Sequence, residues 1–113
     1  MSGTHKRRWW GLSYYVYILA SRRHGTLYVG VTNSLESRGH QHKAKEIEGF
    51  TKRYDVDRLV WWRAYGEVGE AIRFEKQLKR WRREWKTRLV EAENPHWGDL
   101  YPSMMKPDGP PMI

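Results

Sequence analysis

The 113-residue sequence contains no cysteine, which excludes disulfide bridges, cysteine-based zinc sites and a thiol nucleophile. It has no apolar run near the roughly 18 residues that a membrane-spanning helix needs. No basic segment followed by an apolar one opens the chain as a secretion signal would. We therefore expect a cytoplasmic protein with no membrane partner. Any catalysis has to come from tyrosine, histidine, arginine and carboxylate side chains.

Acidic residues are the scarcer charge. The chain has 13 Asp and Glu against 21 Lys and Arg, which gives a formal net charge of +8. Such an excess favours a polyanionic partner, and nucleic acid is the one we expect. The length fits one domain, and seven Trp and seven Tyr supply large apolar side chains for its core.

The first part of the chain predicts a β-hairpin and a helix. Residues 14–20 are mostly β-branched or aromatic, which is typical of a central strand covered on both faces. Residues 21–26 predict the hairpin turn and residues 27–31 the returning antiparallel strand. Asn33, with Glu36 three positions later, resembles a capping box and predicts a helix that ends near residue 44 or 46.

The second part predicts one more strand and a long helix. Residues 45–57 are polar and turn-rich, and residues 59–65 form the strand, with Trp61 and Trp62 on opposite faces. After Gly69 an apolar stripe at steps of three or four predicts a helix of about twenty residues that packs into the core. The stripe consists of Ala71, Phe74, Leu78, Trp81, Trp85 and Leu89, and Lys76, Lys79, Arg80, Arg82, Arg83 and Lys86 lie opposite.

The order β-β-α-β-α predicts an α/β (α+β) fold, in which helices flank a small, mostly antiparallel three-stranded sheet. This domain spans residues 13–101. A basic N-terminal extension, residues 1–12, precedes it. A proline-rich irregular tail, residues 102–113, follows it.

Several short motifs occur in a fixed order along these elements. They are Val16-Tyr17-Ile18, Tyr28-Val29-Gly30, Arg38 and His42 on the first helix, and Glu75 on the long helix. This set resembles the GIY-YIG nuclease family, although Val16 stands where the motif has Gly and Val29 where it has Ile. Three further segments resemble its small stand-alone bacterial members: residues 25–28, 75–79 and 97–100. The resemblance covers residues 14–101 and implies a metal-dependent DNA endonuclease.

Phosphodiester hydrolysis needs a deprotonated water and neutralisation of charge on the phosphate. Tyr17 and Tyr28 lie on neighbouring strands, so one hydroxyl could accept the water proton if the register places both on one face. A phenol with a pKa of about 10 needs help from Arg38, Lys43 or the metal to ionise. Which tyrosine acts is left open.

The two charged residues of the first helix suit the phosphate and the leaving group. Arg38 is assigned to the scissile phosphate, because its guanidinium can bind two phosphate oxygens. His42, one turn later on the same face, either orients or protonates the leaving oxygen or relays the water proton.

Glu75 is the expected ligand of Mg²⁺, with Mn²⁺ as a substitute, because such ions bind through one or two carboxylates and keep several waters. An ion pair with Lys79 is the alternative for Glu75, and the two can coexist. Gly30 permits close approach at its strand. Asn94 supplies either an amide to the site or a turn before Pro95.

The leading hypothesis is a metal-dependent endonuclease that hydrolyses DNA with a tyrosine-activated water. With no room for a targeting module, it would select single strands, flaps or damaged ends, which are the substrates of DNA repair, or use a protein partner for target choice. RNA stays an alternative substrate. The second hypothesis is a nucleic-acid-binding module that kept the fold and lost cutting.

Overall fold

The computed structural model describes residues 14–44 and 49–104. Strands β1 (Tyr14–Ala20), β2 (Leu27–Thr32) and β3 (Arg58–Tyr65) form one antiparallel sheet in the order β2-β1-β3. All residues of β1 except the first are buried, as expected for a central strand covered on both faces. The predicted extension 1–12 and residues 105–113 of the predicted tail lie outside the described residues.

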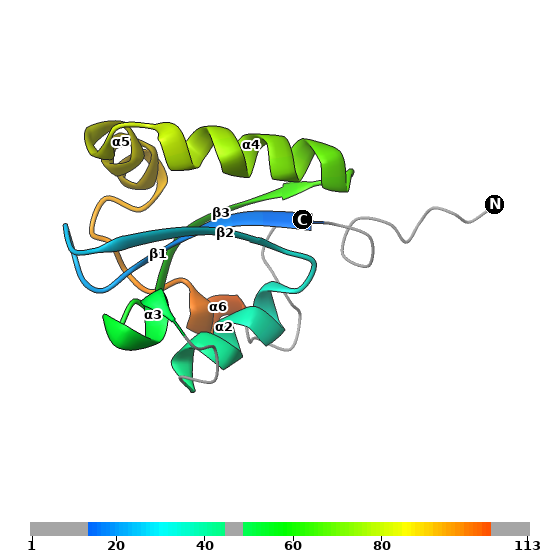
Figure 1. Cartoon of the computed structure of the whole chain (residues 1–113). Helices are drawn as coiled ribbons and strands as arrows, with labels where there is room; N and C mark the ends of the chain where they lie inside the picture. Colours follow the sequence, from blue (N-terminus) through cyan, green and yellow to red (C-terminus); the bar gives the residue numbers. More distant parts are fainter. Residues whose placement is uncertain (1–13, 45–48, 105–113) are drawn as a thin grey trace.

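Helices cover both faces of the sheet (Figure 1). On one face lie α4 (Val68–Arg80) and α5 (Arg83–Glu93). On the other lie α2 (Leu35–Lys43) and two four-residue helices, α3 (Phe50–Arg53) and α6 (Tyr101–Met104), in stretches where the sequence predicted no helix. The predicted α+β fold is confirmed. No helix in the described ranges is long and apolar enough to cross a membrane.

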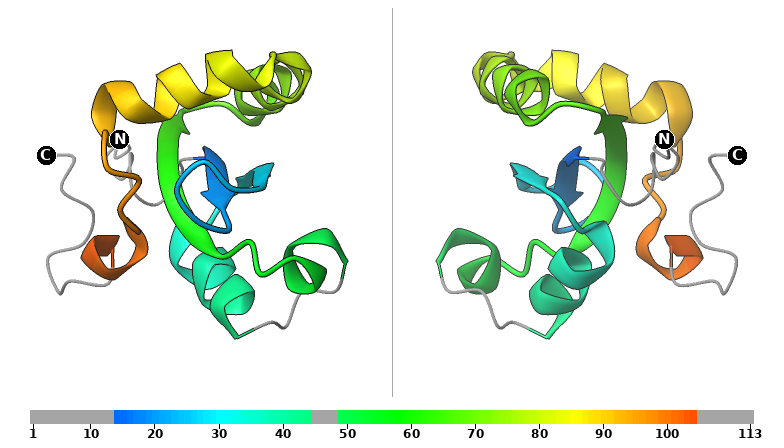
Figure 2. Two further views of the ribbon diagram at one scale, coloured as in Figure 1. Left: turned by 90° about the vertical axis from the view of Figure 1, so that its left-hand side faces the viewer. Right: turned by 90° about the vertical axis from the view of Figure 1, so that its right-hand side faces the viewer.

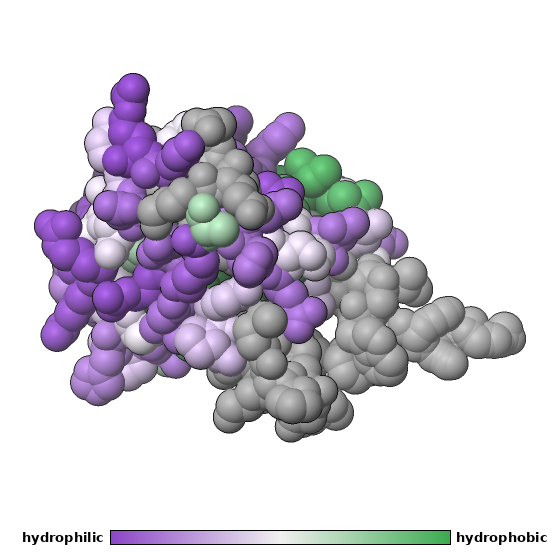
Figure 3. Space-filling model, turned by 90° about the horizontal axis from the view of Figure 1, so that it is seen from below, coloured by the Kyte–Doolittle hydropathy of each residue, from purple (hydrophilic) through white to green (hydrophobic). Residues whose placement is uncertain are grey.

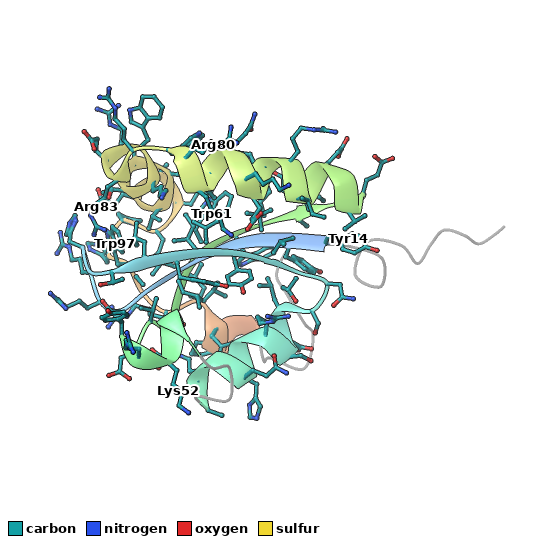
Figure 4. All side chains as sticks on the ribbon, in the orientation of Figure 1. Tyr14, Lys52, Trp61, Arg80, Arg83 and Trp97 are labelled. Atoms are coloured by element: carbon teal, nitrogen blue, oxygen red, sulfur yellow. The ribbon has the colours of Figure 1, made fainter. Side chains whose placement is uncertain are left out.

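The two faces of β1 enter two separate clusters of buried side chains. Val16 and Ile18 join the cluster beneath α4 and α5, together with Trp61. Tyr17 joins the cluster on the α2 side, where Trp62 is partly buried. The prediction that Trp61 and Trp62 point to opposite faces is therefore confirmed, and Figure 4 shows Trp61 between the sheet and α4.

The turn between β1 and β2 sets the register of the site. Ser21 N–H donates to Thr26 O at 3.0 Å, and Ser21 Oγ accepts from Thr26 N–H at 3.0 Å. His24 takes a left-handed conformation with φ of 57°, which allows the chain to reverse within this short loop. The predicted hairpin is confirmed, and its register pairs Tyr17 with Gly30 and Leu19 with Tyr28.

Helix α2 begins one residue later than the capping box predicted. Ser34 Oγ accepts from Ser37 N–H at 3.3 Å, and Thr32 Oγ1 accepts from Ser34 N–H at 3.1 Å. The prediction of Asn33 as the cap was therefore wrong. Ser34 satisfies a free N–H of the first turn in the manner of a serine N-cap.

The single helix of about twenty residues was also a wrong prediction, because Trp81 and Arg82 are extended, with ψ of 146° and 153°. A straight helix of that length would measure about 30 Å, longer than a strand of seven or eight residues at about 3.3 Å each. The break turns α5 across the direction of α4 (Figure 2) and buries Val90 completely. It also leaves Trp85 47% exposed, although the stripe placed it in the core.

The outer edge of β3 is covered by residues 94–100. Leu100 N–H donates to Leu59 O at 2.7 Å, and the Asp99 carboxylate accepts from Leu59 N–H at 3.1 Å. The outer edge of β2 has no strand partner within the described ranges. Figure 2 shows this edge lying between the layer of α4 and the layer of α2 and α3. Side chains from both helical layers can therefore meet around β2.

Candidate active site

Two tyrosines share one face of the sheet at the β2 edge. Tyr17 lies on β1 and Tyr28 two register positions away on β2, which is the diagonal arrangement of neighbouring strands. Their ring centroids are 6.3 Å apart at an interplanar angle of 43°. Tyr17 is 2% exposed, whereas Tyr28 is half-buried. The register thus meets the condition on which the tyrosine mechanism depends.

Gly30 lies directly opposite Tyr17. A Cβ added to Gly30 would come within 2.5 Å of both the hydroxyl oxygen and Cζ of Tyr17, which real Cβ atoms do not tolerate. The close approach expected at this glycine is therefore made by the phenol ring of Tyr17. Gly30 fixes where the Tyr17 hydroxyl can lie.

Arg38 comes to Tyr17 from α2. Its side chain is half-buried and lines a recess of about 10 Å³, room for roughly one water molecule. Tyr17, Asp57 and Tyr101 also line this recess, together with three leucines. A guanidinium beside a buried phenol places positive charge where an anionic oxygen can be bound.

Glu75 comes from the opposite helical layer. It lies on α4 among the buried positions of that helix, with only 8% of the residue exposed. Lys79, one turn later, contacts Glu75 Oε2 through Nζ at 2.5 Å. The ion pair weighed as an alternative is therefore present. It raises the pKa of Lys79, mainly through the hydrogen bond to Glu75 and, as the weakest contribution, through Tyr28.

Charged residues of both helical layers affect the pKa of Tyr17. Burial raises the pKa of Tyr17 well above its usual value, and Tyr28 adds to this increase. Arg38 opposes the increase, and Glu75 contributes to it. Tyr17 therefore keeps its proton at neutral pH, and its hydroxyl lies within electrostatic range of a cation from α2 and a carboxylate from α4.

Comparison with known proteins decides the family of this constellation. The family model described as the GIY-YIG catalytic domain matches residues 13–88, about two thirds of the chain. The chain belongs to the GIY-YIG family. The family consists of endonucleases that are generally metal-dependent. The function of this chain is therefore of the nuclease type.

Two further comparisons complete the picture of relatives. The chain is similar to the solution NMR structure of a UPF0213 protein from Bacillus halodurans, with 29% sequence identity and a TM-score of 0.49. The match covers 77% of this chain and 92% of that one. A search of curated proteins found no match.

Sequence reasoning also assigned Lys43, Asn94 and His42 to the site. Lys43 and Asn94 are hydrogen-bonded to other residues. The Lys43 ammonium is hydrogen-bonded to Asp99 Oδ2 and lies 5.8 Å from the centroid of the Tyr101 ring. Asn94 Nδ2 donates to Val60 O at 3.1 Å and to Gly98 O at 2.8 Å, which is the turn alternative. His42 is part of α2, but its side chain lies outside the described residues.

Glu75 fits a hard divalent cation on the chemistry of its donor. No group of three or more His, Asp or Glu within residues 14–44 and 49–104 could hold a metal ion. Mg²⁺ needs fewer protein ligands than that, since it keeps several waters and takes substrate oxygens beside one or two carboxylates. The buried Glu75 carboxylate would supply one such ligand, and the Lys79 ammonium would have to share it.

Sequence reasoning gave no structural role to Asp99 or Ser34, which stabilise the elements around the GIY-YIG site. Asp99 belongs to a motif that was noticed without any role, yet its carboxylate accepts from Leu59 N–H and Tyr101 N–H and binds Lys43. An aspartate two residues before a helix start is a signal for such hydrogen bonds. Ser34, the true cap of α2, was overlooked beside Asn33, although both are good capping residues.

Proposed function

We propose that this chain hydrolyses phosphodiester bonds in DNA with a divalent cation, Mg²⁺ or Mn²⁺, held by Glu75. The observation that carries the proposal is that Tyr17 and Tyr28 share one face of the sheet. Arg38 lines the recess beside Tyr17 from one helical layer, and the buried carboxylate of Glu75 lies in the other. Phosphoryl transfer depends mainly on positioning and on electrostatic stabilisation. A buried phenol, a guanidinium and a carboxylate around an open strand edge suit that task.

The proposed roles follow from exposure and charge. Arg38 binds the non-bridging oxygens of the scissile phosphate. Tyr28, the half-buried member of the pair, accepts the proton of the attacking water, while Tyr17 keeps its own proton and holds the water or phosphate by donating a hydrogen bond. When bound, the metal neutralises phosphate charge and acidifies a water.

The proposed roles of Lys43 and Lys79 depend on the contacts that the structure gives these residues. His42 keeps the proposed role of orienting or protonating the leaving oxygen. Lys43 is bound to Asp99, so we no longer assign it the role of stabilising a phenolate. We assign that role to Arg38, the metal and Lys79. The Lys79 ammonium binds the Glu75 carboxylate, and Tyr28 contributes weakly to the raised pKa of Lys79, so Lys79 is placed to assist the half-buried tyrosine.

The proposed selectivity is for the structure of the DNA. Contacts from Lys and Arg to phosphates provide affinity without reading sequence, and the chain carries a formal charge of +8. Seen from the side of α2, α3 and α6, the described surface is predominantly hydrophilic (Figure 3), as a polar partner requires. Single strands, flaps and damaged ends are the proposed substrates, with a protein partner as the other source of target choice.

The test is a cleavage assay on end-labelled single-stranded, duplex and flapped DNA, with matching RNA strands, in Mg²⁺, Mn²⁺ or chelator. We expect cutting of DNA only with a metal ion, and a loss of roughly 100-fold or more in Arg38→Ala. Lys52→Ala, which removes an exposed cation from α3, is the matched control and should cut normally.

The same assay separates the two functions that the sequence left open. If the wild-type chain binds every DNA and cuts none in either metal, the chain is a binding module and the proposal is wrong. Cutting that continues unchanged in chelator would remove the metal and Glu75 from the mechanism. Cutting of RNA alone would replace the substrate.

A further inference from the structure

Trp85 stands out because it is a large aromatic side chain on the surface. It is 47% exposed, although tryptophan is usually well buried. The extended residues Trp81 and Arg82 end α4 and start α5 in a new direction, and this removes Trp85 from the core-facing stripe. Its ring still packs against the Trp81 ring, with centroids 6.2 Å apart at 81°. Trp81 in turn packs against Phe74, so Trp85 is the exposed end of an aromatic row that starts in the core.

The surroundings of Trp85 are cationic. The guanidinium of Arg82 lies over the Trp85 ring, 5.8 Å from its centroid. Residues 79–88 contain six basic side chains and one acidic one, Glu84. Figure 4 labels Arg80 and Arg83 near the junction of α4 and α5. Of these basic side chains, Arg83 donates to Gly25 O and Lys79 pairs with Glu75, whereas Arg82 lies at the Trp85 ring itself. An exposed aromatic ring beside a cation is a combination that binds single-stranded nucleic acid, because the ring stacks on a base and the cation binds phosphate.

The exposed apolar side chains do not form a patch around Trp85. The other large exposed ones among the described residues are Tyr54, Val68 and Ile72. Val68 and Ile72 lie in the first half of α4, whereas Trp85 lies in the first turn of α5, after the junction. A lone ring among cations is a poor docking site for an apolar protein surface, which needs a contiguous patch.

The cationic stretch continues to the proposed active site. Lys79 Nζ binds the Glu75 carboxylate at 2.5 Å, and Lys79 O accepts from Lys86 Nζ at 3.4 Å. Trp81 lies six positions after Glu75, a rise of about 9 Å along the helix axis, and the Trp85 ring centroid lies a further 6.2 Å from that of Trp81. This path corresponds to roughly four or five steps of a stacked strand at about 3.4 Å each. A DNA strand at Glu75 can therefore reach Trp85 within a few nucleotides.

We propose that Trp85, with Arg82, is a stacking site for an unpaired base of a single-stranded DNA segment next to the cleavage position. This inference rests on the proposed nuclease function and specifies its substrate: DNA with a single-stranded segment of at least a few nucleotides beside the cut. Phosphates along the segment bind the cations of residues 79–88. A base within a duplex is already stacked on its neighbours and gains nothing from Trp85.

The test measures binding of fluorescent single-stranded and duplex DNA in chelator, where a metal-dependent nuclease does not cut. We expect Trp85→Ala to weaken single-strand binding by roughly 5- to 100-fold and duplex binding by less than about twofold. Trp85→Phe, which keeps an aromatic face, should restore most of the affinity. Ile72→Ala, which removes an exposed apolar side chain from α4, is the matched control. A 2-aminopurine base in the strand should lose fluorescence on binding wild type and keep it on binding Trp85→Ala.

Each outcome separates this inference from the proposed function, because cleavage of the same DNA in Mg²⁺ is measured in parallel. A wild-type chain that cuts, combined with a Trp85→Ala chain that binds single strands equally well, overturns the stacking site alone. Equal weakening of single-strand and duplex binding overturns it too, since it assigns to Trp85 a role in folding or in general affinity. Selective single-strand binding without any cutting would support the stacking site and refute the nuclease proposal.

Discussion

The hydroxyl of Tyr17 lies against the backbone of Gly30, so the smallest added side chain at Gly30 would reach it. Tyr17 is 2% exposed and is held by its neighbours in the sheet, so its ring has little room to move away. The geometry of the tyrosine pair therefore depends on a residue that carries no functional group.

Gly30→Ala should lower the free energy of unfolding by about 1–3 kcal/mol, the usual cost of overpacking a core. It should also slow cleavage more than it weakens DNA binding, because it displaces the Tyr17 hydroxyl. Urea denaturation and single-turnover cleavage measure the two effects. Gly69→Ala is the control, since an added Cβ there meets nothing within 4 Å. Equal effects of the two substitutions would show that Gly30 does not position Tyr17.

A second prediction concerns the stability of the fold at high pH. The pKa of Tyr17 is raised by burial in the folded chain, so the folded state keeps a proton that the unfolded state loses near its usual pKa of about 10. This contribution to stability is complete below pH of about 10 and decreases as the pH rises above it.

Tyr17→Phe removes that contribution, so the wild type should lose stability relative to the variant as the pH rises from about 10 to about 12. Urea denaturation at several pH values measures the difference, and Tyr54→Phe controls for the loss of a half-exposed hydroxyl. A wild-type and Tyr17→Phe difference that stays constant over this range would contradict the assignment.

At the level of single residues, the sequence placed Tyr17 and Tyr28 on neighbouring strands and left their shared face to the register, which the structure supplies. Tyr17 and Tyr28 follow from alternation along two strands joined by a short turn. Lys43 could not be placed in this way, because its partner Asp99 lies 56 residues later in the chain. Contacts over such separations depend on tertiary packing, which a local pattern does not contain.

The connection from α5 to α6 is the element that holds the site face together at the β3 edge. Its Asp99 carboxylate accepts from the N–H groups of Leu59 and Tyr101 and binds the Lys43 ammonium of α2. One carboxylate therefore joins β3, α6 and α2. The sheet edge beside the site is fixed by hydrogen bonds that no sequence period predicts.

Asp99→Ala should lower the free energy of unfolding by roughly 1–3 kcal/mol, because two backbone donors lose their acceptor. Lys43→Ala removes only the partly exposed ion pair and should cost less than about 1 kcal/mol. Thermal or urea denaturation of both variants gives the comparison. If Lys43→Ala costs as much as Asp99→Ala, the ion pair and not the backbone hydrogen bonds holds this edge.

At the level of elements, the strands, the hairpin and α2 were predicted because their patterns are local. The break between α4 and α5 was not, because Trp81, Trp85 and Leu89 continue the helical spacing without a proline or glycine to interrupt it. The break follows from the size of the sheet, since α5 has to turn in order to bury Val90. The cost is the exposure of Trp85.

For the whole molecule, the net charge of +8 determines how binding should respond to salt. Counterion release makes the logarithm of the affinity for single-stranded DNA fall with the logarithm of the salt concentration, with a slope of about −0.7 for each phosphate neutralised.

The cytoplasmic location, the protein partner and RNA as a substrate stay predictions.

Replacing both Arg80 and Arg82 by Gln should reduce the magnitude of the salt slope by about 1.4, as two phosphate contacts require. Fluorescence titrations between roughly 50 and 200 mM salt measure the slope. Lys43→Gln is the control, because that ammonium is already paired with Asp99. A slope that falls equally in the control would indicate that binding depends on total charge and not on residues 79–88.

The proposed metal-dependent cleavage of DNA depends on Glu75, and the rate of a single turnover tests this role. We would measure single-turnover cleavage at saturating DNA in Mg²⁺ for wild type, Glu75→Gln and Glu70→Gln, an exposed glutamate of the same helix. We expect a loss of at least about 100-fold in Glu75→Gln, with DNA binding no weaker than wild type, and an unchanged rate in Glu70→Gln. Cleavage by Glu75→Gln at the wild-type rate would contradict it.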